Sequence, residues 1–307
     1  MTFTGNGMYT ASSKGPRRRG PVPLLLAGLV AVLVVAGGAF AVVGLVATAT
    51  ERREDGFDAV AAVRVDNRTG GAVVVHGADD AAAEGVAVER VLRSSPLAEP
   101  EESARVDGDT LRVEADCDGW VGGACSVDYR IEVPEGTALT VETSSGAIEV
   151  RSVGGAVTAH STTGAVELDD VRGDVAVTTT TGEVRAAGSG GSIEVESTTG
   201  SVDLSGFAAD TVRAEASTAE VRVGGGFQEA EVSTTTGAVD VETDEAFRRI
   251  TVETTTGAVD IRVPDAAYRV TGDSSTGERA VDVPTADDAA AEIAVDTTTG
   301  SVTVRAD

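Results

Sequence analysis

The chain has 307 residues and is strongly acidic, with 50 Asp and Glu against 24 Lys and Arg and a formal net charge of −26. This balance argues against nucleic acid as a partner, because a phosphate backbone is neutralised by basic groups. Aromatic residues make up only 3% of the chain, so small aliphatic side chains must fill any core.

The amino-terminal segment predicts a membrane anchor. Residues 1–21 contain Lys14, Arg17, Arg18 and Arg19 and no acid, and the 25 residues from 22 to 46 carry no charge. Such a run is long enough to span a bilayer as a helix. Because basic residues favour the cytoplasmic side, we expect a cytoplasmic amino terminus and an extracytoplasmic remainder, held at the cell membrane by a single pass.

Two alternatives to this signal-anchor remain open. Ala-Thr-Ala at 47–49 resembles a cleavage site, although a cleavable signal usually has a shorter apolar run of about 7–15 residues. A buried core helix is the other alternative, and the length of the uncharged run argues against it. The tail 1–21 is too short to form an enzyme or a signalling domain.

One short phrase recurs through the second half of the chain. In VETSSGAIEV, residues 141–150, hydroxyl residues and a glycine separate two runs in which alternate residues are aliphatic. A degenerate copy carries Ala219 in the glycine position, and the spacings between copies run from 18 to 23 residues. A period near 20 residues predicts a solenoid, whose units bury their apolar faces against one another. The turn glycines are Gly146, Gly164, Gly182, Gly200, Gly237, Gly257, Gly277 and Gly300.

The spacing of the apolar residues predicts the shape of each unit. A period of two on both sides of the glycine indicates strands with one buried face, and only the Gly277 copy breaks it, with Arg279 where Val is expected. Eighteen residues allow two strands of about five residues and two short turns, but no crossover helix of about a dozen residues. We therefore expect an all-β fold, a right-handed parallel β-helix or β-roll solenoid with coils of 18–23 residues, preceded by one N-terminal transmembrane helix. An antiparallel meander is the main rival, and it gives no reason for the units to copy one another.

The less regular region before the repeats reads as a cap. Val63, Val65, Val73 and Val75 flank a turn and predict an early, divergent coil, whereas residues 94–109 read as an exposed loop. The predicted organisation is a cytosolic basic tail at 1–21, a transmembrane helix at 22–46, a linker at 47–59, irregular N-terminal β coils with a disulfide loop at 60–135, and the regular solenoid at 136–307.

The carboxyl end shows no cap in the sequence, since the chain stops seven residues after Gly300. We expect an exposed strand edge there, open to edge-to-edge self-association unless Arg305 and Asp307 blunt it.

The sequence predicts no catalytic, cofactor or metal site. Cys117 and Cys125 are the only cysteines, and a pair in an exported domain predicts a disulfide. His76 and His160 are the only histidines and have no metal-ligand spacing. No nucleophile elbow, P-loop or dinucleotide fingerprint occurs, so we expect no enzyme. We interpret T-T-G as structural, with Gly serving a turn or a positive φ, and stacked Thr and Ser bonding to the turn backbone and to one another.

The stretch VPEGTALTVETSSGAIEV at 133–150, followed by the T-T-G repeats, resembles a bacterial domain-of-unknown-function family of β-strand repeats described as “putative adhesins”. The resemblance covers roughly residues 60–307. It implies a right-handed β-solenoid that is exported or membrane-anchored, and it supplies no catalytic motif.

The leading functional hypothesis is a membrane-anchored, extracytoplasmic solenoid that binds or scaffolds at the cell envelope, with an envelope protein or polysaccharide as its partner. Solenoids provide extended binding surfaces of this kind. The ectodomain of an envelope-stress sensing or regulatory system is one alternative. A polysaccharide-active β-helix enzyme is the second, and it requires convergent carboxylates in a groove.

Overall fold

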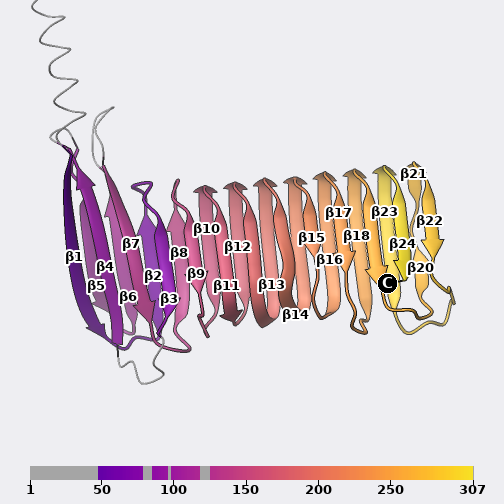
Figure 1. The fold of residues 1–307 in the computed structure, drawn as a ribbon, viewed down its shortest axis with the longest axis horizontal. Coiled ribbons are helices and arrows are strands. Elements are labelled where there is room, and N and C mark those ends of the chain that lie inside the picture. Colours follow the sequence, from indigo (N-terminus) through magenta and orange to yellow (C-terminus); the bar gives the residue numbers. More distant parts are fainter. Residues whose placement is uncertain (1–47, 79–84, 96–97, 118–124, 307) are drawn as a thin grey trace, which may run out of the picture. The chain divides into compact units, whose positions relative to one another are not determined.

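The computed structural model describes residues 48–78, 85–95, 98–117 and 125–306 (Figure 1). Thr48–Asp307 forms a compact unit separate from Met1–Ala47. The described residues form strands and turns, and they contain no helix long and apolar enough to cross a bilayer. The segment 22–46, for which the sequence predicts a transmembrane helix, lies outside them.

Each coil of the regular array has two strands joined at a T-T-G corner. The first complete coil of this type consists of β8 (Ala138–Thr143), Gly146 and β9 (Ile148–Arg151). The next coil lays β10 (Val157–Thr163) parallel to β8 and β11 (Val166–Arg172) parallel to β9. We call the strands before the glycine the first stack and those after it the second stack.

The array continues through β12 (Val175–Thr181), β13 (Val184–Thr199), β14 (Val202–Thr218), β15 (Val221–Val223), β16 (Phe227–Thr236), β17 (Val239–Glu242), β18 (Arg249–Thr256) and β19 (Val259–Val263). All pairings between neighbouring coils here are parallel, which confirms the predicted solenoid and excludes the antiparallel meander. β13 and β14 run through the second turn, so each contributes a strand to both stacks.

The interior between the stacks is filled by columns of small aliphatic side chains. The column two residues after the glycine is almost fully buried in every regular coil, and full burial of a Val contributes about 1.5–3 kcal/mol. Because each side chain lies directly above its counterpart, an interior of constant width accepts the same residue in coil after coil. The column consists of Ile148, Val166, Val184, Val202, Val221, Val239, Val259 and Val302.

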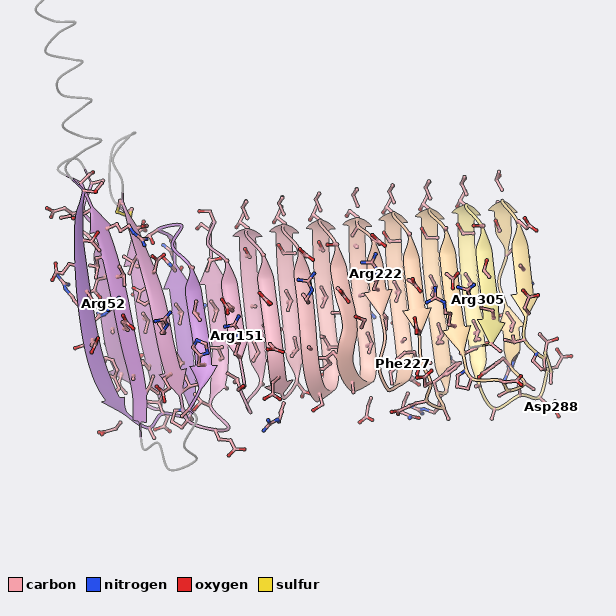
Figure 2. All side chains as sticks on the ribbon, viewed as in Figure 1. Arg52, Arg151, Arg222, Phe227, Asp288 and Arg305 are labelled. Carbon is pink, nitrogen blue, oxygen red and sulfur yellow. A yellow bond between two sulfur atoms is a disulfide. The ribbon has the colours of Figure 1, made fainter. Side chains whose placement is uncertain are left out.

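A few aromatic residues form a column of their own in the carboxyl-terminal half. Phe227 lies at the edge of the coils opposite the T-T-G corners (Figure 2). Its ring centroid is 6.1 Å from that of Phe247, whose ring stacks on Tyr268 at 5.4 Å with an interplanar angle of 8°. The Tyr268 hydroxyl donates a 2.8 Å hydrogen bond to the Pro264 carbonyl. These aromatic side chains therefore fill the second turn, which connects one coil to the next opposite the T-T-G corners.

The glycine of the T-T-G corner is required by a close backbone approach. A Cβ built on Gly182 falls 2.0 Å from the Gly164 carbonyl oxygen, and one on Gly257 falls 1.7 Å from that of Gly237. The Gly182 N–H in turn donates to the Thr199 carbonyl at 3.0 Å, so the corners cannot move apart without losing a hydrogen bond. Gly182 has a positive φ of 159°, whereas Gly257 does not have one in the left-handed range, so the shared constraint is the space taken by the neighbouring carbonyl.

The buried hydroxyl column beside these corners is only partly hydrogen-bonded. Thr143 donates to the Gly146 carbonyl at 3.1 Å and lies 3.5 Å from the Ser161 hydroxyl. Five further hydroxyls are buried and have no partner among the described residues, at a cost of about 1–3 kcal/mol for each unpaired group. The predicted bonding to the turn backbone therefore holds for Thr143, for Ser161 and for Ser274, which donates to the Gly300 carbonyl at 2.9 Å, and it is wrong for these five residues. These five hydroxyls belong to Thr179, Ser197, Thr234, Thr254 and Thr297.

The order of coils in space departs from the order in sequence at the amino-terminal end. The predicted early coil exists, as β2 (Ala62–Asn67) and β3 (Val73–Gly77). On one side of this coil, β2 pairs with β8 and β3 pairs with β9. On the other side, β2 pairs with β6 and β3 pairs with β7, which belong to a segment later in the sequence. That later segment consists of β6 (Thr110–Asp116) and β7 (Ser126–Val133).

Antiparallel strands close this end. β4 (Gly85–Ser94) pairs with β7 and with β1 (Ala49–Asp58), and β5 (Glu101–Asp107) pairs with β6. Two predictions were therefore wrong: the linker 47–59 contains a ten-residue strand, and the loop 94–109 contains a seven-residue strand. Both are edge strands with no regular buried face, so their sequences lack the alternation that identifies a strand.

The carboxyl-terminal end is also rearranged, and its outermost coil is not the last one in the sequence. The last strands, β23 (Glu292–Thr299) and β24 (Val302–Ala306), pair directly with β18 and β19. The preceding segment lies outside them and pairs with their free edge. Arg305 consequently belongs to an inner coil, 3.2 Å from Asp260, and does not protect the outermost strand edge. The outer strands are β20 (Arg269–Thr271), β21 (Ser274–Thr276) and β22 (Arg279–Asp282).

The glycine contacts predict a specific stability effect. We expect Gly257→Ala to lower the free energy of unfolding by about 3 kcal/mol or more, because its Cβ cannot fit against the Gly237 carbonyl. Thermal unfolding followed by circular dichroism measures the change. Gly56→Ala is the control, since a Cβ on Gly56 meets nothing within 4 Å. Equal midpoints for the two variants would contradict the role assigned to the corner.

Candidate binding surfaces

The structure does not bring the candidate chemical residues of the sequence together. His76 lies on β3 in the second stack and His160 on β10 in the first. In the described ranges, no group of three or more His, Cys, Asp or Glu side chains is arranged to hold a metal ion. The candidate sites are therefore surfaces, set by how the coils repeat.

Cys117 and Cys125 form a disulfide, with their Cα atoms 6.1 Å apart. Cys117 follows β6 of the first stack and Cys125 precedes β7 of the second. The bond therefore closes the connection between the two strands of one coil near the amino-terminal end. Trp120, inside this loop, lies outside the described residues.

A buried ion pair fastens the amino-terminal cap together. Arg90 on β4 is 5% exposed and contacts Glu102 on β5 and Asp55 on β1. Arg53 adds a 2.7 Å contact to Glu102 from the outside. Since β1 and β4 extend the second stack and β5 extends the first, this network joins the two layers where the apolar core ends. Burial also raises the pKa of the neighbouring Tyr129 hydroxyl above its usual range.

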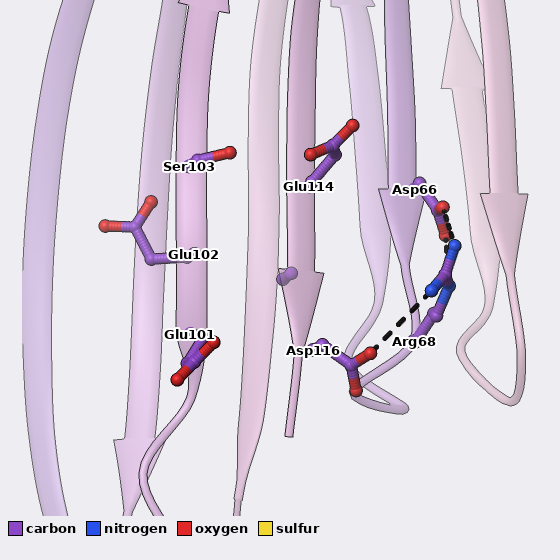
Figure 3. Close-up of a pocket in the computed structure, with 8 residues that line it drawn as sticks. Asp66, Arg68, Glu101, Glu102, Ser103, Glu114 and Asp116 are labelled. Atoms are coloured by element: carbon purple, nitrogen blue, oxygen red, sulfur yellow. Dashed lines mark hydrogen bonds and ion pairs between the residues drawn. The ribbon is translucent and has the colours of Figure 1, made fainter. Parts of the chain in front are cut away.

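An acidic hollow of about 400 Å³ lies beside this network, on the outer side of the first stack. Figure 3 shows carboxylates of β5, β6 and β2 around it, with Arg68 as the basic residue of its lining. Arg68 binds Asp66 at 2.6 Å and lies 3.8 Å from Asp116. The lining residues are Asp66, Arg68, Glu101, Glu102, Ser103, Glu114, Ala115 and Asp116.

The outer face of the first stack carries a column of carboxylates, which we call the acidic column. In register across consecutive coils lie Glu196, Glu215, Ser233, Glu253 and Asp296. Asp273 of the outermost coil extends it, since its N–H donates to the Asp296 carboxylate at 3.2 Å. Neighbouring members are about 4.8 Å apart along the ladder, a spacing at which like charges oppose folding.

Most of the acidic column lacks basic partners. Glu215 binds Arg213, but Glu196, Glu253, Asp296 and Asp273 form no ion pair within the described residues. Exposed hydroxyls run alongside in a parallel column, two residues before the turn glycine of each coil from Gly164 onward, or before Ala219 in the degenerate copy. A hollow of about 350 Å³ lies over the carboxyl-terminal part of both columns. The hydroxyl column comprises Thr162, Thr180, Thr198, Ser217, Thr235, Thr255, Thr298 and Ser275.

Most acids on the outer face of the second stack are paired with arginines. Glu183 binds Arg185 at 2.6 Å, and Glu242 binds Arg262 at 2.7 Å. Glu220 likewise contacts Arg222, which is visible with Arg305 in Figure 2. From Gly182 to Asp260, the acids of this face each have an arginine neighbour, whereas Glu167 and Asp169 of the preceding coil form no ion pair within the described residues. The two faces of the solenoid therefore differ in how far their acids are paired, although both derive from the same repeat.

The sequence contained the signal for this difference, but reading it requires the strand register. Each carboxylate of the acidic column lies four residues before its turn glycine, as Glu196 does before Gly200, or before Ala219 in the degenerate copy. The arginines of the second stack follow their glycines by three or five residues, as Arg185 follows Gly182. Sorting charges by distance from the glycine separates the two faces.

The Toastrack DUF4097 family model matches residues 104–305, and the chain belongs to this family. This confirms the resemblance seen in the repeat. Three solved structures are similar at low identity. They are a “putative adhesin” from Bacteroides fragilis (12% identity, 84% of this chain, 97% of that chain, TM-score 0.44), a “putative adhesin” from Parabacteroides distasonis (11%, 83%, 97%, 0.43) and a “Putative lipid binding protein” from the same species (13%, 83%, 97%, 0.43).

These printed descriptions belong to those proteins, and the family assignment rests on the family model alone. No curated protein matches the chain.

The cap network predicts a graded response to charge removal. We expect Glu102→Gln to lower the free energy of unfolding by about 2–4 kcal/mol, because it leaves the buried Arg90 charge with a weaker set of partners. Glu114→Gln, which removes an exposed partner of Arg105 on the adjacent strand, should cost less than about 0.5 kcal/mol. Hydrogen exchange of β1, β4 and β5 reports the local loss. Equal protection in both variants would show that the network does not hold the cap.

Proposed function

We propose that this chain is a membrane-anchored, extracytoplasmic binding and scaffolding module of the cell envelope, and that the outer face of the first stack is its binding surface. The observation that carries the proposal is the difference in charge pairing between the two faces. From Gly182 to Asp260, the acids of the second stack are paired with arginines, whereas most of the acidic column is unpaired. An uncompensated column opposes folding, so its retention favours a role in recognition.

A repeated array of this kind suits a partner that carries cationic groups at intervals. Carboxylates and hydroxyls recur at each coil, so one partner chain is able to contact several coils at once. Contacts that are individually weak then add through effective concentration. Charge complementarity also speeds the encounter and makes it sensitive to salt. A basic protein segment and an amino-bearing envelope polysaccharide share this chemistry.

Envelope location is supported by two independent features. Residues 22–46 carry no charge and follow the basic cluster of residues 14–19, which favours insertion with the solenoid outside. The disulfide between Cys117 and Cys125 suits an oxidising compartment. A span at 22–46 would place the β1 strand directly after the membrane in the chain.

A fractionation experiment tests the anchor. We expect the full chain to sediment with membranes and to be cleaved by protease added to intact cells. Deletion of residues 22–46 should leave the protein out of the membrane fraction. Recovery of the full chain in the cytosol, protected from external protease, would contradict the proposed location.

A charge-removal experiment tests the binding face. The triple variant Glu196→Gln, Glu253→Gln, Asp296→Asn should reduce recovery of cross-linked envelope partners by about tenfold, with loss of the salt dependence. The matched control Glu183→Gln, Glu220→Gln, Glu242→Gln removes three paired acids from the opposite face and should retain partners. Mass spectrometry after cross-linking in cells identifies them as protein or polysaccharide-linked species. Equal loss in both variants, or no partner above background for the native chain, would refute this assignment of the face.

A further inference from the structure

The outermost coil at the carboxyl-terminal end, residues 269–283, keeps the backbone of the repeat but lacks the core side chain at two of its inward positions. Arg279 takes the register position of Val302, which itself lies on Val259. The strand alternation places it on the side that faces the core in every other coil. Gly272 replaces the valine of the neighbouring column, packed against the Val295 backbone. These two interior columns therefore end without a valine, whereas the columns beside them end in Val270 and Val281, which pack partly buried against the core.

The same coil leaves backbone donors free in the spacing of the repeat. In the inner coils, Gly257 N–H donates to the Thr299 carbonyl and Gly300 N–H to that of Thr276. Among the described residues, no carbonyl accepts from Gly277 N–H, the next in this series. A further T-T-G coil would satisfy it. The backbone at this end is thus available for pairing with a further strand, whereas the side chains disfavour such pairing.

A strand of this same repeat is what would pair with the free edge. A second copy of this chain is therefore the partner whose pairing must be prevented. Two copies that meet through their outermost coils, related by a twofold axis, would align both edges at once in antiparallel register. The other end of the solenoid is closed differently, by the antiparallel β1 and β5 strands, whose exposed positions are rich in charge. The carboxyl-terminal edge is therefore the one that needs a device against stacking.

We propose that Arg279 is that device: a charged residue placed in the core column, which prevents end-to-end pairing of two copies. Extending the solenoid would bury the guanidinium against Val281 and its counterpart in the second copy, with no carboxylate in the column to pair with it. Arg279 forms no ion pair within the described part of the chain. Inward-pointing charges protect sheet edges in this way.

The test replaces the charge and follows self-association of the full chain, reconstituted in lipid nanodiscs with one copy per disc. We expect Arg279→Val to associate at least about tenfold more tightly than the native chain, as paired discs in sedimentation velocity and in electron micrographs. Arg279→Glu, which keeps a charge of opposite sign, should stay single like the native chain.

The matched control is Arg269→Val. Arg269 belongs to the same coil and is also exposed, but its register partner Glu292 lies on the outer face. It should leave the discs unpaired, and circular dichroism confirms that each variant folds. Unpaired discs for Arg279→Val, or equal pairing for Arg269→Val, would overturn the proposal. Pairing by Arg279→Glu would show that the arginine itself, and not a charge, is responsible.

Discussion

The close approach of identical backbone corners governs this structure. Parallel hydrogen bonding fixes the separation of neighbouring coils at about 4.8 Å, and at the T-T-G corner that distance leaves no room for a side chain on the glycine. Once the corners are in register, every other position is in register too. Valine columns, hydroxyl columns and charge columns then follow from repetition of one coil, without any long-range instruction in the sequence.

A structure built from repetition must solve its ends separately, and the two ends of this solenoid use different means. The amino-terminal end reverses strand direction and joins its two layers with the buried Arg90–Glu102 pair. The carboxyl-terminal end keeps the strand direction but replaces two core valines of its outermost coil with Arg279 and Gly272. One end is closed by new pairing, the other by removal of what a neighbour would pack against.

The regular coils could be predicted from sequence because their side chains report local environment with a period of two. The register of β10 on β12, for example, follows from aligning Gly164 with Gly182. The ends could not, because their order depends on competition between distant strands. Nothing near Val302 indicates that it lies between Val259 and Arg279. The β1 and β5 strands were missed because exposed edges lack alternation, and the acidic column was missed because its members lie about 20 residues apart.

The insertion of the last strands inside the stack imposes an order on assembly. A chain that emerges with its amino terminus first forms the array up to β18 and β19 one coil at a time, as each new segment becomes available. Residues 269–282 emerge next, but their pairing surface does not yet exist, because it is made by β23 and β24. They remain unpaired until β23 and β24 have paired with β18 and β19. The solenoid is therefore completed only when the whole polypeptide has been delivered, so a chain interrupted before β23 retains an open edge.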